Sequence, residues 1–195
     1  MSVEYEFCDV IDDWVLLRCE YECKIKNISS KKEKYELVYE IERPLGPQPP
    51  EFEKQGVFRL ELGKSIPSDI DQEERNRIIE KADDDVADTE IFKRYKKNCE
   101  IESGEEIDVY IGAYVPKRLV DSELWRSALT SDGLTVKVRY DPNKIDLRLI
   151  PVHPSNDDKK ERIDDHQVRF EINEPLMPKN GVYLWWAPKV EAGGE

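Results

Sequence analysis

The chain has very little histidine and none of the short motifs that mark common catalytic sites. Only two histidines occur in 195 residues, His153 and His166. Two carboxylates, Asp164 and Asp165, precede His166, but neighbours on a strand point to opposite faces, and no second histidine lies at ligand spacing. Gly-x-Ser-x-Gly, Walker A, dinucleotide-binding glycine and His-Glu-x-x-His patterns are absent from the sequence. We therefore expect no catalytic residue, metal site or cofactor, with carboxylates that converge only in space left as the alternative.

Long apolar runs and basic blocks are also missing. The longest apolar stretches, WVLL from Trp14 and VYLWWAP from Val182, are far shorter than the roughly 20 residues of a membrane-spanning helix. The net charge is −13, from 30 basic and 43 acidic residues, so most of the surface repels duplex DNA and anionic membranes. We expect no membrane insertion by this chain and no duplex nucleic-acid partner. A local cationic pocket for a small anion remains compatible with this charge.

Cysteine is present without the spacing of a redox or zinc motif. The four cysteines are Cys8, Cys19, Cys23 and Cys99, and no Cys-x-x-Cys pair occurs. Cys19 and Cys23 are four residues apart on an expected strand, which separates their Cα atoms by roughly 13 Å and excludes a mutual disulfide. We expect buried thiols in a reducing compartment, and hence a cytoplasmic location.

Alternation of apolar and polar residues is the dominant pattern of the sequence. It extends over twelve residues from Val15 to Lys26 and returns in KYELVYEIE from Lys34, which predicts two strands joined as a hairpin by a polar connection. Asp132-Gly133 and Asp141-Pro142-Asn143 are turn signals. Counting the N-terminal VEYEFCDV, about nine strands are predicted, the others at 56–62, 107–115, 134–140, 145–150, 167–173 and 181–186. These features predict an all-β fold, mainly an antiparallel β-sandwich.

One charged segment departs from the strand pattern. Residues 68–98 carry apolar side chains at helical spacing, such as Ile78 with Ala82 and Ile91 with Tyr95. We expect a short helical insertion there, within a single β-rich domain spanning residues 1–195. The division into halves would then be 1–66 and 99–190, with the insert at 67–98.

Two similar nine-residue segments, which we call the repeated phrase, occur in the chain: YEIERPLGP from Tyr39 and FEINEPLMP from Phe170. A Gly-Val-aromatic run follows each copy. Proline cannot donate to a β ladder, so Pro44 and Pro175 should end their strands and lead the chain across the end of the core. Leu45 and Leu176 are then placed to plug that end. The phrase indicates either two pseudo-repeated halves or two unrelated local crossovers.

The strand that follows the second copy is apolar on both faces. Aligned on the first copy, Leu184 and Trp186 fall where Arg59 and Glu61 stand, on the face expected to point outward. We therefore predict a partner-binding stripe, formed by Val182, Leu184 and Trp186. The alternative is that the helical insert covers this stripe with its own apolar side chains, Ile79, Phe92 and Tyr95.

Two functions fit these observations. The first is a non-catalytic β-sandwich binding module that recognises a protein partner, because motifs are absent and Tyr and Trp are abundant. The second is a sensor for a small anionic ligand such as a nucleotide. Its aromatic side chains would stack on a base and its cations would meet phosphate. The candidate residues for that site are Tyr110, Tyr114, Lys117, Arg118, Trp125 and Arg126.

Overall fold

The fold is all-β. The computed structural model describes residues 1–42, 46, 48–52, 56–63, 85–89, 92–152 and 158–189. This part of the chain contains no helix and thirteen strands. The strands are β1 (Ser2–Ile11), β2 (Trp14–Lys26), β3 (Glu33–Glu42), β4 (Gly56–Gly63), β5 (Asp85–Asp88), β6 (Phe92–Ile101), β7 (Glu106–Arg118), β8 (Asp121–Arg126), β9 (Leu134–Arg139), β10 (Ile145–Val152), β11 (Asp158–Arg162), β12 (Gln167–Ile172) and β13 (Gly181–Pro188). All nine strands predicted from alternation are present.

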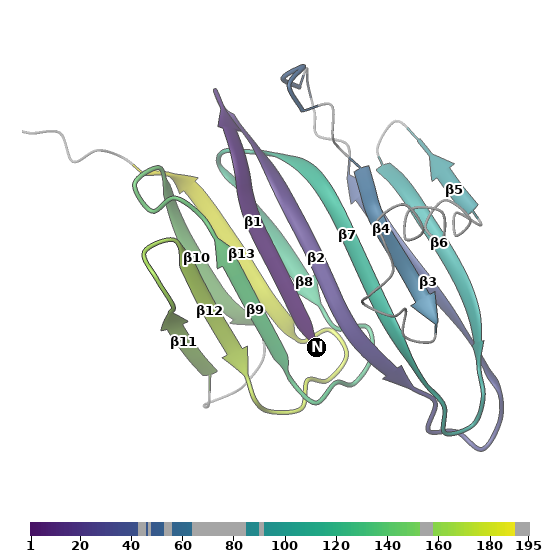
Figure 1. Cartoon of the computed structure of the whole chain (residues 1–195). Coiled ribbons are helices and arrows are strands. Elements are labelled where there is room, and N and C mark those ends of the chain that lie inside the picture. Colours follow the sequence, from purple (N-terminus) through teal and green to yellow (C-terminus); the bar gives the residue numbers. More distant parts are fainter. Residues whose placement is uncertain are drawn as a thin grey trace, which may run out of the picture.

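The strands form one large sheet and two small ones (Figure 1). The seven-stranded sheet has the order β11-β12-β9-β1-β2-β7-β4, and the three-stranded sheets have the orders β10-β13-β8 and β3-β6-β5. Every pairing is antiparallel except that of β1 with β9. The prediction of mainly antiparallel pairing is confirmed.

Both small sheets pack on the same face of the seven-stranded sheet. On β1, Phe7 meets Trp186 of β13 edge to face, with ring centroids 5.3 Å apart. On β2, Tyr21 lies 5.8 Å from Tyr39 of β3, again between ring centroids. Figure 1 shows the β10-β13-β8 sheet behind strands β12, β9 and β1. One continuous core therefore lies between the large sheet and the two small ones, with buried residues from all three.

The predicted hairpin between the first two long strands is wrong. β2 pairs with β1 and β7, whereas β3 pairs with β6 in another sheet. The chain changes sheets at Asn27, a buried side chain whose Nδ2 donates to the carbonyls of Lys31 at 2.7 Å and Ile101 at 2.9 Å. These bonds tie the loop at Lys31 and the end of β6 together where the chain crosses between sheets. The polar connection is thus a crossover between layers.

The predicted helical insertion is not seen. In its second part the chain forms β5 and β6, while residues 68–84 lie outside the described part. β6 pairs with β3 along its whole length, from Glu33 opposite Ile101 to Glu42 opposite Phe92. This long-range ladder overrides the local helical spacing of Phe92 and Tyr95, because helix propensity is a weak preference beside tertiary pairing.

The same pattern of pairing occurs twice along the chain. β2 pairs with β7, β3 with β6, β4 with β7 and β5 with β6. In the same order, β8 pairs with β13, β9 with β12, β10 with β13 and β11 with β12. β1 stands outside this scheme, between β2 and β9.

The repeated phrase does not follow that pattern. Its first copy lies between β3 and β4 and its second between β12 and β13, whereas the pairing makes β12 equivalent to β6. Each copy does carry the chain from one sheet to another. In the second copy Leu176 is fully buried and exchanges two backbone hydrogen bonds with Ser131, as expected for a plug. Pro44 and Leu45 lie outside the described residues.

Candidate functional site

The expected partner-binding stripe is not on the surface. Val182, Leu184 and Trp186 are fully buried. The indole Nε1 of Trp186 donates to the carbonyl of Arg118 at 3.0 Å, and Phe7 covers the ring. The stripe therefore belongs to the core, where Phe7 of β1 covers Trp186; Ile79, named as a possible cover, lies outside the described residues.

A β-bulge in β4 explains why the alignment of the two copies assigned Leu184 and Trp186 to the outward face of β13. The register of β4 shifts between Val57, which is opposite Ala113, and Arg59, which is opposite Gly112. One extra residue moves everything after it to the other face of the sheet. β13 pairs with its neighbours in an unbroken register. Its outward residues are consequently Tyr183 and Trp185, both only partly buried.

Those two aromatic residues belong to an apolar face that crosses all three strands of the β10-β13-β8 sheet. Tyr183 is opposite Leu124 on one side and Ile150 on the other, and Leu124 and Ile150 are 41% and 48% exposed. In the next outward row Trp185 is opposite Ser122 and Arg148. We call Leu124, Ile150, Tyr183 and Trp185 the outer apolar face.

The charges around this face differ in sign from the rest of the chain. Arg126 and Arg148 point outward from the same sheet, and Asp146 is the acidic residue on that side, so the three sum to +1. The chain as a whole carries −13. The guanidinium carbon of Arg148 lies 5.3 Å from the Trp185 ring centroid and its Nη2 lies 3.9 Å from Asp146 Oδ2. Arginine is held there over an aromatic ring while staying accessible to an anion.

The sequence contained part of this face. IDLRLI from Ile145 alternates, so that Asp146, Arg148 and Ile150 fall on one side, and the structure buries the opposite side. Strand β8, which supplies Leu124, has the sequence DSELWR and gave no alternation signal. Leu124, Tyr183 and Ile150 are neighbours only because of how three strands pair that are distant in sequence. The sequence alone therefore did not reveal this row.

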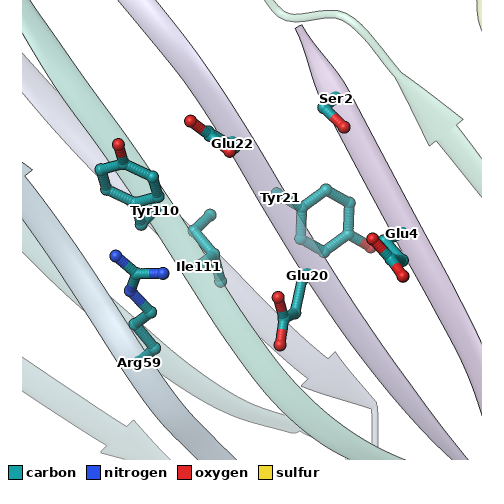
Figure 2. A pocket seen from close by; sticks show the side chains of 8 residues that line it. All are labelled: Ser2, Glu4, Glu20, Tyr21, Glu22, Arg59, Tyr110 and Ile111. Atoms are coloured by element: carbon teal, nitrogen blue, oxygen red, sulfur yellow. The ribbon is translucent and has the colours of Figure 1, made fainter. Parts of the chain in front are cut away.

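A second candidate is a shallow hollow of about 60 Å³ on the opposite, outward side of the seven-stranded sheet. Figure 2 shows Glu4, Glu20 and Glu22 on β1 and β2 with Arg59 beside Tyr110, the guanidinium carbon 4.1 Å from the ring centroid. Arg59 also pairs with the buried Glu61 at 2.7 Å. The volume suits about two water molecules, and three carboxylates repel phosphate. This hollow therefore does not match a nucleotide.

The six residues considered for an anion site do not converge. Tyr110 lines the hollow, and Tyr114 lies further along the same outward face. Lys117 points the other way and pairs with Glu123 at 2.8 Å. Although burial favours the neutral amine, the charge and hydrogen bond of Glu123 raise the pKa of Lys117. Arg118 stacks on Trp14, with 3.9 Å between guanidinium carbon and ring centroid.

The remaining two residues of that set lie on the β10-β13-β8 sheet, on opposite faces. Trp125 packs against the core, whereas Arg126 is exposed at the rim of the outer apolar face. Among the described residues, the side chains proposed to stack on a base and those proposed to bind phosphate therefore lie on separate surfaces.

Three tyrosines lie together in the core, Tyr5 fully buried and Tyr21 and Tyr39 partly buried. The hydroxyls of Tyr5 and Tyr21 are 3.3 Å apart, and burial raises the pKa of Tyr5, Tyr21 and Tyr39 well above the usual phenol value. Burial likewise raises the pKa of the Cys19 thiol. The expectation of buried thiols is confirmed for Cys19, whereas Cys23 and Cys99 are only partly buried and Cys8 is exposed at a bulge in β1.

Among the residues that the structure describes, no group of three or more His, Cys, Asp or Glu side chains is arranged to hold a metal ion. His166 lies in the turn between β11 and β12, where its backbone N–H donates to Asp164 Oδ1 at 2.7 Å. His153 is outside the described residues. Over the described ranges, no helix has the length and apolar character needed to cross a membrane. Comparison with known proteins found no matching family model and no matching curated protein.

Proposed function

We propose that this protein is a non-catalytic β-sandwich module that binds a protein partner through the outer apolar face. The observation that carries the proposal is the row formed by Leu124, Tyr183 and Ile150 across three paired strands, with Trp185 beside it. Exposed apolar residues are ordinary when they are scattered, but a contiguous group on one sheet is typical of an interaction site.

The composition of the face supports the same proposal. Aromatic residues and arginine are enriched at the centres of protein interfaces, where they contribute a large share of the binding energy. Trp185, Tyr183 and Arg148 supply all three of the residue types that dominate such centres. A fixed β-sheet presents them with little conformational freedom, so little entropy is lost on binding.

We further propose that the chain consists of two pseudo-equivalent β-sandwich halves, β2–β7 and β8–β13, joined by β1. The support is the recurrence of four strand pairings in the same order. This division differs from the halves 1–66 and 99–190 expected from the repeated phrase.

No arrangement of the described residues favours a small-anion sensor. Its candidate cations are engaged by Glu123 and Trp14 or lie apart from its candidate aromatic residues. Arg126 is instead assigned to the rim of the outer apolar face.

The test is site-specific photo-crosslinking in cell extract. A photoreactive side chain is placed at Ser122, on the outer apolar face, and, in a second protein, at Glu40 on the solvent side of the β3-β6-β5 sheet. We expect one or a few discrete crosslinked proteins from Ser122 only.

Two lysine substitutions serve as the matched pair for this experiment. Ile150→Lys alters the face, and Val38→Lys alters an isolated residue of similar exposure on the other small sheet, 41% against 48%. Ile150→Lys should abolish the Ser122 crosslinks, whereas Val38→Lys should leave them unchanged. Crosslinks that are the same from both sheets, or that survive Ile150→Lys, would contradict the proposal.

A further inference from the structure

The pairing scheme makes the β8-β13-β10 sheet equivalent to the β2-β7-β4 part of the large sheet. The outward faces of these two groups of strands can therefore be compared directly. On the β2-β7-β4 face, Trp14 and Leu16 point outward from β2, and Tyr114 from β7. This group has the same character as the outer apolar face, with aromatic and aliphatic side chains on adjacent strands.

A short segment of the chain itself covers the apolar end of the β2-β7-β4 face. Phe52 packs against Trp14 and Leu16, and Phe52 and Trp14 are only 2% and 4% exposed. The segment Gln48–Phe52 is not part of any strand, and a turn between the N–H of Phe52 and the carbonyl of Pro49, at 3.1 Å, shapes it. The chain thus places an aromatic side chain of a short irregular segment on the apolar part of this face.

The two faces share one further detail. Arg118 lies over Trp14 at 3.9 Å, and Arg148 lies over Trp185 at 5.3 Å, each measured from guanidinium carbon to ring centroid. The first pair adjoins the cluster that Phe52 covers. The second is open, because Trp185 is partly exposed and the Arg148 side chain is 67% exposed.

The size of the outer apolar face limits what can occupy it. Three strands spaced about 4.8 Å apart and about six residues long, at about 3.3 Å per residue, give a footprint of about 280 Å². A stable interface between two folded proteins buries about 800 Å² on each partner. A second copy of this chain docked on the face alone would fall well short of that area. A short segment with one anchor matches it.

The charge of the face indicates what should flank the anchor. With Arg126 and Arg148, this surface has a net charge of +1, whereas the net charge of the whole chain is −13. The surface therefore attracts a carboxylate that lies beside the anchor. The internal segment has the same composition, since the acidic residue Glu51 immediately precedes Phe52.

We propose that the outer apolar face binds a short extended segment of another protein that carries an aromatic anchor next to an acidic residue. This inference rests on the proposed function and names the class of partner. The segment would do for the β8-β13-β10 sheet what Gln48–Phe52 does for the β2-β7-β4 face.

The experiment selects peptide ligands directly, so the partner need not be identified first. Phage-displayed random 12-residue peptides are selected on the immobilised full chain and counter-selected on the Leu124→Lys/Ile150→Lys double variant. Enriched peptides are synthesised with a fluorophore, and their Kd is measured by anisotropy. Far-UV circular dichroism and thermal melting establish that each variant is folded.

We expect enriched peptides to share an aromatic residue with a neighbouring Asp or Glu. Ile150→Lys should weaken their binding at least about tenfold, as should alanine in place of the aromatic anchor, whereas Val38→Lys should change it less than about twofold. Arg148→Glu should weaken binding of the acidic peptides and reduce its dependence on salt. The inference is overturned if no peptide is enriched, if the double variant binds equally well, or if the consensus lacks an aromatic anchor.

Two further results separate this inference from the proposed function. If Ser122 crosslinks to a partner but no peptide binds, the face recognises a folded surface. The proposed function then holds, and the inference of a short-segment partner is wrong. If sedimentation shows a dimer of this chain that Ile150→Lys disrupts, the occupant is a second copy and the inference is wrong.

Discussion

Alanine in place of Trp186 or of its neighbour Trp185 tests which face of β13 is the core. The two residues are adjacent and identical, so the pair is matched in chemistry and differs only in the direction of the side chain. Trp186 is fully buried beneath Phe7, whereas Trp185 points outward and is partly exposed. The structure therefore predicts unequal losses of stability.

The magnitudes follow from burial. Removing a fully buried tryptophan costs about 3–5 kcal/mol, because a cavity remains where the ring was. The upper end applies to Trp186, since the carbonyl of Arg118 also loses its hydrogen-bond donor at 3.0 Å. Trp185 loses only part of its contact area and an exposed cation–π contact with Arg148. We expect about 1–2 kcal/mol there, since no closed cavity forms.

The assay is urea unfolding followed by far-UV circular dichroism, with the free energy of unfolding extrapolated to water at equal m-values. Because total stability is only about 5–15 kcal/mol, Trp186→Ala can prevent folding altogether. Trp186→Phe and Trp185→Phe form a milder second pair, with an expected loss of about 1–3 kcal/mol for the first and less than about 1 kcal/mol for the second. Equal losses, or a larger loss at Trp185, would refute the assignment of the core face and with it the outer apolar face.

Three other predictions concern the core and its closure. Gly181→Ala should lower the free energy of unfolding by about 3 kcal/mol, measured in urea, because a Cβ there would stand 1.9 Å from the carbonyl oxygen of Trp125; an unchanged value would contradict the close approach of β13 to β8. By the same measurement, Leu176→Ala should lower the free energy of unfolding by about 2–5 kcal/mol and Met177→Ala by less than about 0.5 kcal/mol, because Leu176 is fully buried and Met177 is 59% exposed. Similar losses for both variants would show that Leu176 does not fill the end of the core. Above pH 10 the free energy of unfolding should fall as pH rises, because burial raises the pKa of Tyr5 and the folded state keeps a proton that the unfolded phenol releases. Each such tyrosine contributes a slope of up to about 1.4 kcal/mol per pH unit, so Tyr5→Phe should make the decline measured between pH 9 and 11 shallower, and an identical decline would show that Tyr5 does not contribute.

Much of the fold could be predicted from alternation. The nine strands expected from the sequence all exist, because an alternating segment has one apolar face that a sheet can bury. The turn at Asp141 is also confirmed, with the N–H of Asn143 donating to Asp141 Oδ1 at 2.9 Å. The second Pro-Leu crossover buries Leu176 as expected.

The strands that were missed have a common physical cause. β6 shows helical spacing, β8 and β11 are short and mostly polar, and β5 has four residues. None of these segments carries enough periodic signal alone. Each is a strand because a partner lies beside it, as β3 lies beside β6 and β13 beside β8.

The candidate site depended still more on contacts that are distant in sequence. β13 was correctly identified as the strand with two apolar faces, but the prediction of which face points outward was wrong. The bulge after Val57 shifts the register of β4, the strand to which β13 was aligned. A bulge is set by how one strand fits another, so the spacing of residues within a strand does not reveal it. The outer apolar face became visible only when three strands were placed side by side.

The sequence by itself determined that this chain folds into strands and where most of them lie, since a two-residue period is a property of each segment alone. The tertiary structure decided which strands pair, which sheet each joins and which side of β13 faces the solvent. Those choices depend on hydrogen bonds and packing between segments far apart in the chain, such as β1 with β9 and β8 with β13. No single segment carries that information, because pairing is set between strands, and a strand with two apolar faces, such as β13, can bury either face until its neighbours are fixed.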